Sequence, residues 1–275
     1  MNDGSLLSAE LTVRYPGKPP VLRGVMLEIA PGEIMGLVGQ SGSGKSTLAL
    51  AILGLLGRQR AMVEGNILFQ GADLVTMKES DLREIRGRSI SLVLQSPISS
   101  LNPALRIRTQ LKEAWRAHAN GTSAACDAAI RAALTSVSLL ADEDFLRKHA
   151  SQLSVGQAQR VLIAMAVMHR PALLIADEAT SALDVITQSE ILQLFARLNR
   201  ETGMSILYIS HDLPSVAEIC QRIAILHEGE IVENGTAAEI FAAPRHPYTR
   251  RLMASLPQLP TRMNDSPAAQ AATAE

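Results

Sequence analysis

The chain has 275 residues, enough for one large domain or two packed lobes around a substantial core. Only 3 % of the residues are aromatic, so aliphatic side chains must build that core, as in proteins with buried parallel strands covered by helices. The formal net charge is −1 and no run of Lys or Arg forms a stripe, which argues against nucleic acid as a partner.

The cysteines and the apolar runs indicate where such a chain would reside. Cys126 and Cys220 lie far apart without metal-ligand spacing, so we expect two buried free thiols in a reducing compartment. Residues 1–10 lack the features of a signal peptide, and no apolar run approaches the ~20 residues needed to span a bilayer. We therefore expect a cytosolic protein that reaches a membrane only through partners.

The N-terminal part of the chain alternates strands with helices. Short apolar runs bounded by turn residues predict its strands. They cover residues 6–14, 22–29, 34–38, 65–70 and 89–94. Apolar and amphipathic spacing predicts helices over 48–56 and 77–86, and a loop follows over 96–103.

A glycine-rich loop joins the strand over 34–38 to the helix over 48–56. It comprises Gly39, Gln40, Ser41, Gly42, Ser43, Gly44, Lys45, Ser46 and Thr47, with the pattern G-x-x-x-x-G-K-S. Its glycines permit positive φ and let backbone amides approach an anion, and the helix N-terminus adds free N–H groups. Lys45 offers a positive charge for the β and γ phosphates, and Ser46 a hydroxyl for a phosphate-bound Mg²⁺. A turn without a ligand is the alternative, but the complete pattern favours a nucleoside triphosphate site.

In the middle of the chain the predicted secondary structure changes from alternating strands and helices to helices alone. From residue 109 to about 148 the spacing is helical and offers no strand, which predicts a helical lobe inserted into the α/β core. Thr122 or Ser123 caps one of its helices. The polar segment over 152–157 then leads into a helix over 158–169.

Two later strands end in residues that can carry chemistry. The strand over 172–176 runs into Asp177 and Glu178, and adjacent carboxylates at the end of a buried strand are costly unless a cation or hydrogen-bond donors receive them. An acidic pair at a helix N-terminus is the alternative. The strand over 205–209 leads to His211, at the edge where open α/β sheets bind ligands, although alone this histidine fits a structural role equally well.

The remaining elements are short. Residues 187–190 form a capping-box pattern that predicts a helix to about 201. A hairpin is expected over 222–233, and a second capping box at 236–239 starts a last helix. The tail over 261–275, rich in Ala and polar residues, is expected to be disordered.

Six motifs in this order resemble those of the ATP-binding cassette (ABC) ATPases, from residue 6 to about 257. They are the glycine-rich loop (Walker A), Gln95 (Q-loop), 153–157 (signature), 173–178 (Walker B), 181–184 (D-loop) and His211 (switch histidine). The resemblance implies an α/β ABC ATPase cassette over 1–260. Such a cassette has a P-loop mixed sheet core, an N-terminal antiparallel β subdomain and an inserted α-helical subdomain, here at about 96–165.

The resemblance also implies ATP and Mg²⁺ as cofactors. Ser46, Gln95 and Asp177 would hold Mg²⁺, with Gln95 also counted among the catalytic residues. Glu178 would polarise the attacking water, and His211 would hold the γ-phosphate. Tyr15 matches the aromatic residue that stacks on adenine, although a half-buried strand residue that caps a turn is the simpler interpretation of it.

The signature implies a dimer, because Ser154 and Gly156 would meet the ATP bound to an opposite cassette, and Asp184 of the D-loop is also expected at the nucleotide. The family usually has glycine where this chain has Val155, and a β-branched side chain restricts the backbone there. The site completed by this signature is therefore the weaker one. An alternative, a hydrolysis-poor half of a heterodimer, is opposed by Glu178 and His211.

Residues 96–103 and 244–250 resemble the dipeptide, oligopeptide and nickel import ATPases, and the short chain favours the nickel-type subunit without excluding peptides. That group implies a second ABC ATPase subunit, two permeases and indirectly an extracytoplasmic solute-binding protein, at the cytoplasmic face of the inner membrane. The competing hypothesis is a soluble ABC-type ATPase that acts on nucleic acid or ribosomes.

Overall fold

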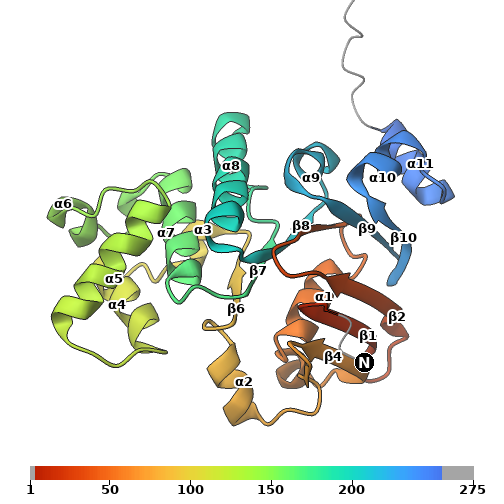
Figure 1. The fold of residues 1–275 in the computed structure, drawn as a ribbon, viewed down its shortest axis with the longest axis horizontal. Helices are drawn as coiled ribbons and strands as arrows, with labels where there is room; N and C mark the ends of the chain where they lie inside the picture. The colour runs from red at the N-terminus through yellow and green to blue at the C-terminus, as the bar shows by residue number, and fades with distance from the viewer. Residues whose placement is uncertain (1–3, 256–275) are drawn as a thin grey trace, which may run out of the picture.

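The computed structural model describes residues 4–255 and contains two sheets with helices around them (Figure 1). The larger sheet has the order β10 (Glu230–Thr236), β9 (Arg222–His227), β3 (Ile34–Val38), β8 (Ser205–Ser210), β7 (Leu173–Asp177) and β6 (Ile90–Val93). The smaller sheet has the order β2 (Pro20–Ile29), β1 (Leu7–Arg14), β4 (Met62–Phe69) and β5 (Ala72–Asp73). The larger sheet is mixed, because β10 pairs antiparallel with β9 while the other pairs are parallel, and the smaller sheet is antiparallel throughout.

The helices connect and cover these strands. They are α1 (Lys45–Ile52), α2 (Glu79–Ile85), α3 (Pro97–Ser100), α4 (Ile107–Arg116), α5 (Ser123–Ser136), α6 (Glu143–Arg147), α7 (Val155–Val167), α8 (Val185–Thr202), α9 (Leu213–Ile219), α10 (Ala237–Ala242) and α11 (Pro247–Ala254), with short 3₁₀ turns at Leu56–Gln59 and Ala150–Gln152. The expected combination of a mixed sheet core, an antiparallel β unit and a helical insertion is confirmed.

The central strands explain where the site forms. Every residue of β3 and β8 is buried, as are the first four residues of β7. Because both faces of these strands are covered, their sequences are largely apolar and do not alternate apolar with polar residues. Val38 pairs with Ser210, and Asp177 pairs with Ile209, in parallel register. The carboxyl ends of the strands therefore meet at one edge of the sheet, where open α/β sheets bind ligands.

Helices α4 to α7 gather at a distance from α1 (Figure 1). Apolar side chains such as Leu111, Ile130 and Leu134 are fully buried among them. The amide of Gln110 ties the preceding loop to α4, since its oxygen accepts from the Asn102 N–H at 2.8 Å and its nitrogen donates to the Leu105 carbonyl at 3.1 Å. The boundaries of this helical part, placed by sequence at about 96–165, stay a prediction.

The capping box expected at residues 187–190 is wrong. Helix α8 begins at Val185, because the Asp184 carboxylate accepts from the N–H groups of Ile186 at 3.1 Å and Thr187 at 3.0 Å. Glu190 instead pairs with Arg160 on α7, with 2.8 Å between nitrogen and oxygen. An aspartate three residues upstream is a strong N-cap, so it determines the start of the helix.

Other expectations differ in detail. The capping box at Thr236 and Glu239 is confirmed by reciprocal hydrogen bonds of 2.9 and 3.2 Å, and Thr122 caps α5. The loop over 96–103 contains the short helix α3, and β4 starts at residue 62, earlier than expected. Both cysteines are buried and free. The tail over 261–275 lies outside the described residues, and within 4–255 no helix is long and apolar enough to cross a membrane.

Candidate active site

The phosphate loop between β3 and α1 depends on glycine at positions that admit no side chain. A Cβ on Gly39 would lie 2.2 Å from the carbonyl oxygen of Leu226 in β9, closer than any real contact. Gly44, which precedes α1, has φ of +111°, and a Cβ there would lie 2.5 Å from the Leu22 side chain. The loop is thus packed tightly against its neighbours, keeps its backbone near the sheet edge and leads directly into the N-terminus of α1.

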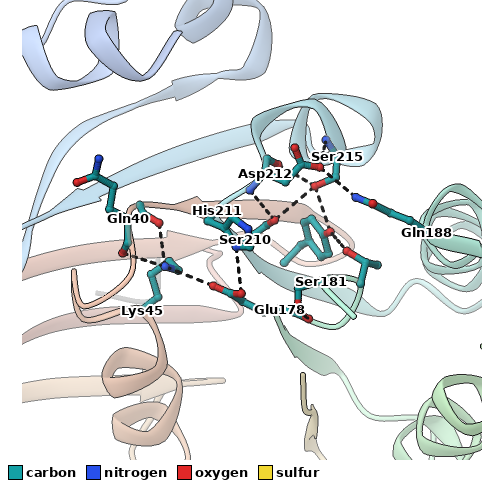
Figure 2. Close-up of polar contacts among 12 residues, drawn as sticks. Gln40, Lys45, Glu178, Ser181, Gln188, Ser210, His211, Asp212 and Ser215 are labelled. Carbon is teal, nitrogen blue, oxygen red and sulfur yellow. Dashed lines mark hydrogen bonds and ion pairs between the residues drawn. The ribbon is translucent and has the colours of Figure 1, made fainter. Parts of the chain in front are cut away.

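Lys45 is held inside this loop. Its side chain is only 5 % exposed, and its ammonium group donates to the carbonyl oxygens of Gly39 at 2.8 Å and Gln40 at 3.1 Å. The same nitrogen lies 3.6 Å from Oε1 of Glu178 (Figure 2). A positive charge is therefore preorganised at the loop that offers backbone N–H groups, which is the arrangement that receives a polyphosphate.

The loop faces a cavity of about 590 Å³. Beside the loop residues, its lining includes Gln95, Glu178 and His211, which follow β6, β7 and β8 respectively. A volume of this size is typical of a nucleotide or cofactor site. The structure thus brings together, at one edge of the sheet, four sequence segments that were predicted to act together.

Glu178 and His211 form a polar pair in this cavity. Nδ1 of His211 lies 3.0 Å from Oε2 of Glu178, so one carboxylate connects the histidine to Lys45 (Figure 2). The backbone of Glu178 has φ of +49°, which is rare for a residue with a long side chain, and its N–H donates to the Ile209 carbonyl at 2.9 Å. This backbone conformation aims the carboxylate across the strand ends toward the phosphate loop.

Asp177 ends β7 beside the phosphate loop. Burial raises the pKa of its carboxyl group above the usual range, with a further rise from Glu178, while the Ser46 hydroxyl and the Lys45 ammonium oppose the rise. Its Oδ1 atom is buried and has no hydrogen-bond partner among the described residues. An orphaned carboxylate oxygen next to a serine hydroxyl fits the oxygen ligands that Mg²⁺ prefers. Within residues 4–255 no group of three His, Cys, Asp or Glu side chains forms a metal site of its own.

A buried hydrogen-bond network, which no sequence motif predicted, lies behind His211. The Tyr208 hydroxyl contacts Thr180 Oγ1 at 2.8 Å and donates to Ser215 Oγ at 3.2 Å. Asp212, next to the histidine, accepts from the side-chain amide of Gln188 on α8 at 3.0 Å (Figure 2). A tyrosine inside an otherwise apolar strand is the signal that predicts such a network, because its hydroxyl needs a partner when buried.

We expect Tyr208→Phe to lower both stability and turnover. The change leaves hydroxyls of Thr180 and Ser215 short of a partner in the core, which costs about 1–3 kcal/mol of unfolding free energy. Ser215 of this network donates to the carbonyl oxygen of Asp212 at 2.8 Å, next to His211, so kcat should fall about fivefold if His211 has the role that the ABC resemblance implies. Urea denaturation and phosphate release would measure the two effects. Thr202→Val, which removes the hydroxyl that donates to Leu198 O at 2.7 Å, is the control and should lower stability alone. Unchanged kcat in Tyr208→Phe would contradict a link between the network and His211.

The signature residues lie apart from the cavity. Among the described residues that line it, neither Ser154 nor Gly156 occurs. Ser154 caps α7, accepting from the Gln157 N–H at 3.1 Å, and a Cβ on Gly156 would lie 2.8 Å from the Thr187 methyl group in the first turn of α8. Val155 is the first residue of α7, helical and 41 % exposed, so this position does not use the conformational freedom of glycine.

Two further predicted contacts are not brought to the cavity. Tyr15 follows β1 and is not among the lining residues, so its stacking on adenine stays a prediction. Asp184 serves as the N-cap of α8, and the backbone N–H and hydroxyl of Thr187 lower the pKa of its carboxyl group. Conversely, Val21 and Leu252 line the cavity although no motif in the sequence pointed to them.

Comparison with known proteins identifies the family. A family model described as ABC transporter matches residues 22–181, more than half of the chain, and one described as oligopeptide/dipeptide transporter, C-terminal region, matches residues 232–274. The chain belongs to the ABC transporter family. This ABC protein is accordingly an ATP-binding ATPase, as the motifs predicted.

Relatives of this ABC ATPase include a transport protein and two solved cassettes. It is 40 % identical over 252 residues to the dipeptide transport ATP-binding protein DppD of Haemophilus influenzae, a match that covers 90 % of this chain and 76 % of that protein. Its fold is similar to the ATP-binding cassette MJ0796, solved as a dimer in a post-hydrolysis state with ADP and Pi (TM-score 0.73, 28 % identity, 84 % of this chain and 98 % of that one). It is also similar to cbiO1 of Clostridium perfringens, part of the complex cbiONQ (TM-score 0.76, 28 % identity, 92 % and 100 %).

Proposed function

We propose that the chain is the ATP-hydrolysing subunit of an ABC importer for peptides. The observation that carries the solute class is the match of residues 232–274 to the C-terminal region of oligopeptide and dipeptide transporters. The printed name of the DppD relative, a dipeptide transport protein, supports the same class. The competing hypothesis of an ATPase acting on nucleic acid or ribosomes gains no support from these relatives.

The preference for a nickel-type subunit finds no support. Neither the matched C-terminal region nor the DppD relative is named for nickel. His246 has a structural role instead, because it is the N-cap of α11 and its Nδ1 accepts from the Tyr248 N–H at 3.2 Å. We therefore place peptides before nickel as the transported solute.

The residues in and next to the cavity fit the chemistry of ATP hydrolysis. The phosphate-loop amides and Lys45 bind and orient the β and γ phosphates of ATP. Ser46, Gln95 and Asp177 are the residues that would hold Mg²⁺, which when bound neutralises charge on the phosphates. Glu178 orients the attacking water and accepts its proton. His211 lies 3.0 Å from the Glu178 carboxylate, positions that carboxylate and contacts the γ-phosphate.

A second cassette completes each site. Ser154 and Gly156 do not line the cavity of their own chain, which is consistent with a role at the nucleotide of an opposing subunit. Asp184 is proposed to lie at that nucleotide as well. Lys45, Glu178 and His211 gather in one cavity, which argues against a hydrolysis-poor chain. The proposed partners are a second ABC ATPase subunit, two permeases and indirectly a solute-binding protein, at the cytoplasmic face of the inner membrane.

Reconstitution with its membrane partners tests the solute class. The tagged chain is purified from its native membrane in mild detergent, and the recovered complex is placed in proteoliposomes with ATP inside and the solute-binding protein of the same system outside. We expect two permeases and a second cassette to co-purify, and ATP-dependent uptake of a radiolabelled dipeptide that Glu178→Gln abolishes. Uptake of radioactive nickel without peptide uptake would contradict the peptide assignment. Recovery of ribosomes without permeases would contradict the importer itself.

A further inference from the structure

The C-terminal helix α11 lies against the phosphate loop, a contact that the proposed mechanism does not use. Tyr248, in its first turn, is only 3 % exposed, and its hydroxyl oxygen accepts a hydrogen bond of 3.1 Å from the backbone N–H of Gln40. Leu252, one helical turn further along the same face, lines the cavity that contains Lys45. The face of α11 that carries Tyr248 and Leu252 therefore packs against the phosphate loop and contributes Leu252 to the wall of the cavity.

Tyr248 is fixed by contacts that do not involve the phosphate loop. Its ring stacks on His227 at the end of β9, with 3.7 Å between ring centroids and 13° between ring planes. The segment before α11 is anchored by the Glu233 carboxylate, which accepts from the backbone N–H groups of Arg245 at 2.7 Å and His246 at 3.0 Å. The ring stack and these hydrogen bonds therefore restrict the orientation of the Tyr248 ring and of its hydroxyl group.

The backbone of Gln40 connects Tyr248 to Lys45 through two hydrogen bonds. The carbonyl oxygen of Gln40 accepts from the Lys45 ammonium at 3.1 Å, while its N–H donates to Tyr248. This hydrogen bond is partly buried, and the tyrosine hydroxyl supplies the acceptor that the Gln40 N–H needs where the loop packs against α11. The first half of the phosphate loop is therefore held between Lys45 on one side and α11 on the other.

We propose that Tyr248 is a positioning residue for the phosphate loop. Its hydroxyl keeps Gln40 in the orientation from which the loop and Lys45 bind the polyphosphate of ATP. The inference rests on the phosphate-binding role proposed above for Lys45. Through Tyr248, the C-terminal region of this chain would raise the affinity of the site for ATP.

Tyr248→Phe in the full-length chain tests this role, because it keeps the ring stack and removes the acceptor. We expect the dissociation constant for ATP, measured by calorimetry, to rise about tenfold, since ordering the loop around phosphate then leaves the Gln40 N–H without a partner. The KM for ATP should rise with it, while kcat changes by about twofold at most. Amide hydrogen exchange over residues 39–44 of the ATP-bound protein should accelerate while exchange in α8 stays the same. Arg251→Ala, exposed on the same helix, is the matched control with wild-type values expected.

A comparison of Tyr248→Phe with Lys45→Ala separates the role of Tyr248 from that of the phosphate loop. Wild-type ATP affinity in Tyr248→Phe, together with a strong loss in Lys45→Ala, would overturn the positioning role alone. Wild-type affinity in both variants would overturn the phosphate-binding role on which it rests. A loss of affinity accompanied by a lowered Tm and faster exchange throughout the protein would also count against the proposal, because it indicates general destabilisation. His227→Ala removes the stack and keeps the hydroxyl, so a smaller loss of affinity than in Tyr248→Phe supports the hydrogen bond as the cause.

Discussion

We expect Glu178→Gln to lower kcat for ATP hydrolysis about a thousandfold while ATP binding survives. The amide has the shape of the carboxylate but cannot accept a proton from the attacking water. It also loses the charge that faces Lys45 at 3.6 Å and His211 at 3.0 Å. Phosphate release under saturating ATP measures the loss, and calorimetry measures the retained binding.

The same variant should accumulate in a state that the wild-type chain passes through quickly. If two cassettes close around ATP and open after hydrolysis, the Glu178→Gln substitution holds them closed, and size-exclusion chromatography with ATP should show a dimer. Glu143→Gln is a matched control, because Glu143 is an exposed carboxylate paired with Arg108 far from the cavity. Hydrolysis at the wild-type rate in Glu178→Gln would remove this residue from its proposed role.

Lys45→Ala should weaken the binding of ATP itself, with a dissociation constant about a hundredfold higher. The ammonium group is buried and already oriented by two loop carbonyls, so its charge-assisted hydrogen bonds to phosphate cost little reorganisation. Its removal also leaves Glu178 facing the phosphates without the neighbouring cation.

Calorimetric titration with ATP measures this loss directly. The control is Lys112→Ala, which removes a lysine paired with Asp127 in the helical part of the chain, at 3.5 Å. Both variants lose one positive charge, so a nonspecific effect of net charge would appear in each of them. Wild-type affinity in Lys45→Ala would contradict the assignment of the phosphate loop.

The sequence alone was sufficient to predict elements and site residues where the local pattern and the burial of the residues agree. The apolar run of β3 followed by the glycine-rich loop could be placed without a structure, because the strand, the turn and the helix start each have their own signal. The family motifs then related Glu178 and His211 to the same site. The parallel pairing of β7 and β8 places these residues at one edge, and they lie 3.0 Å apart.

The sequence was insufficient where distant segments meet or where two local signals compete. The residues at 187 and 190 matched a capping box, but Asp184 upstream supplies the actual cap. No pattern in the sequence connects Tyr248 to Gln40, since 208 positions separate them. Such contacts depend on tertiary packing, and neither propensity nor periodicity encodes which loop a helix will touch.

The left-handed backbone of Glu178 has a consequence for how this chain could change over time. A residue with a side chain at φ of +49° costs of order 1–3 kcal/mol, and glycine would remove that cost. Selection for stability and selection for hydrolysis therefore act in opposite directions at this one position. Because such a replacement also removes the carboxylate beside the buried Lys45, we expect the relief of strain to appear as a higher Tm of Glu178→Gly than of Glu178→Ala, in which the carboxylate is equally absent.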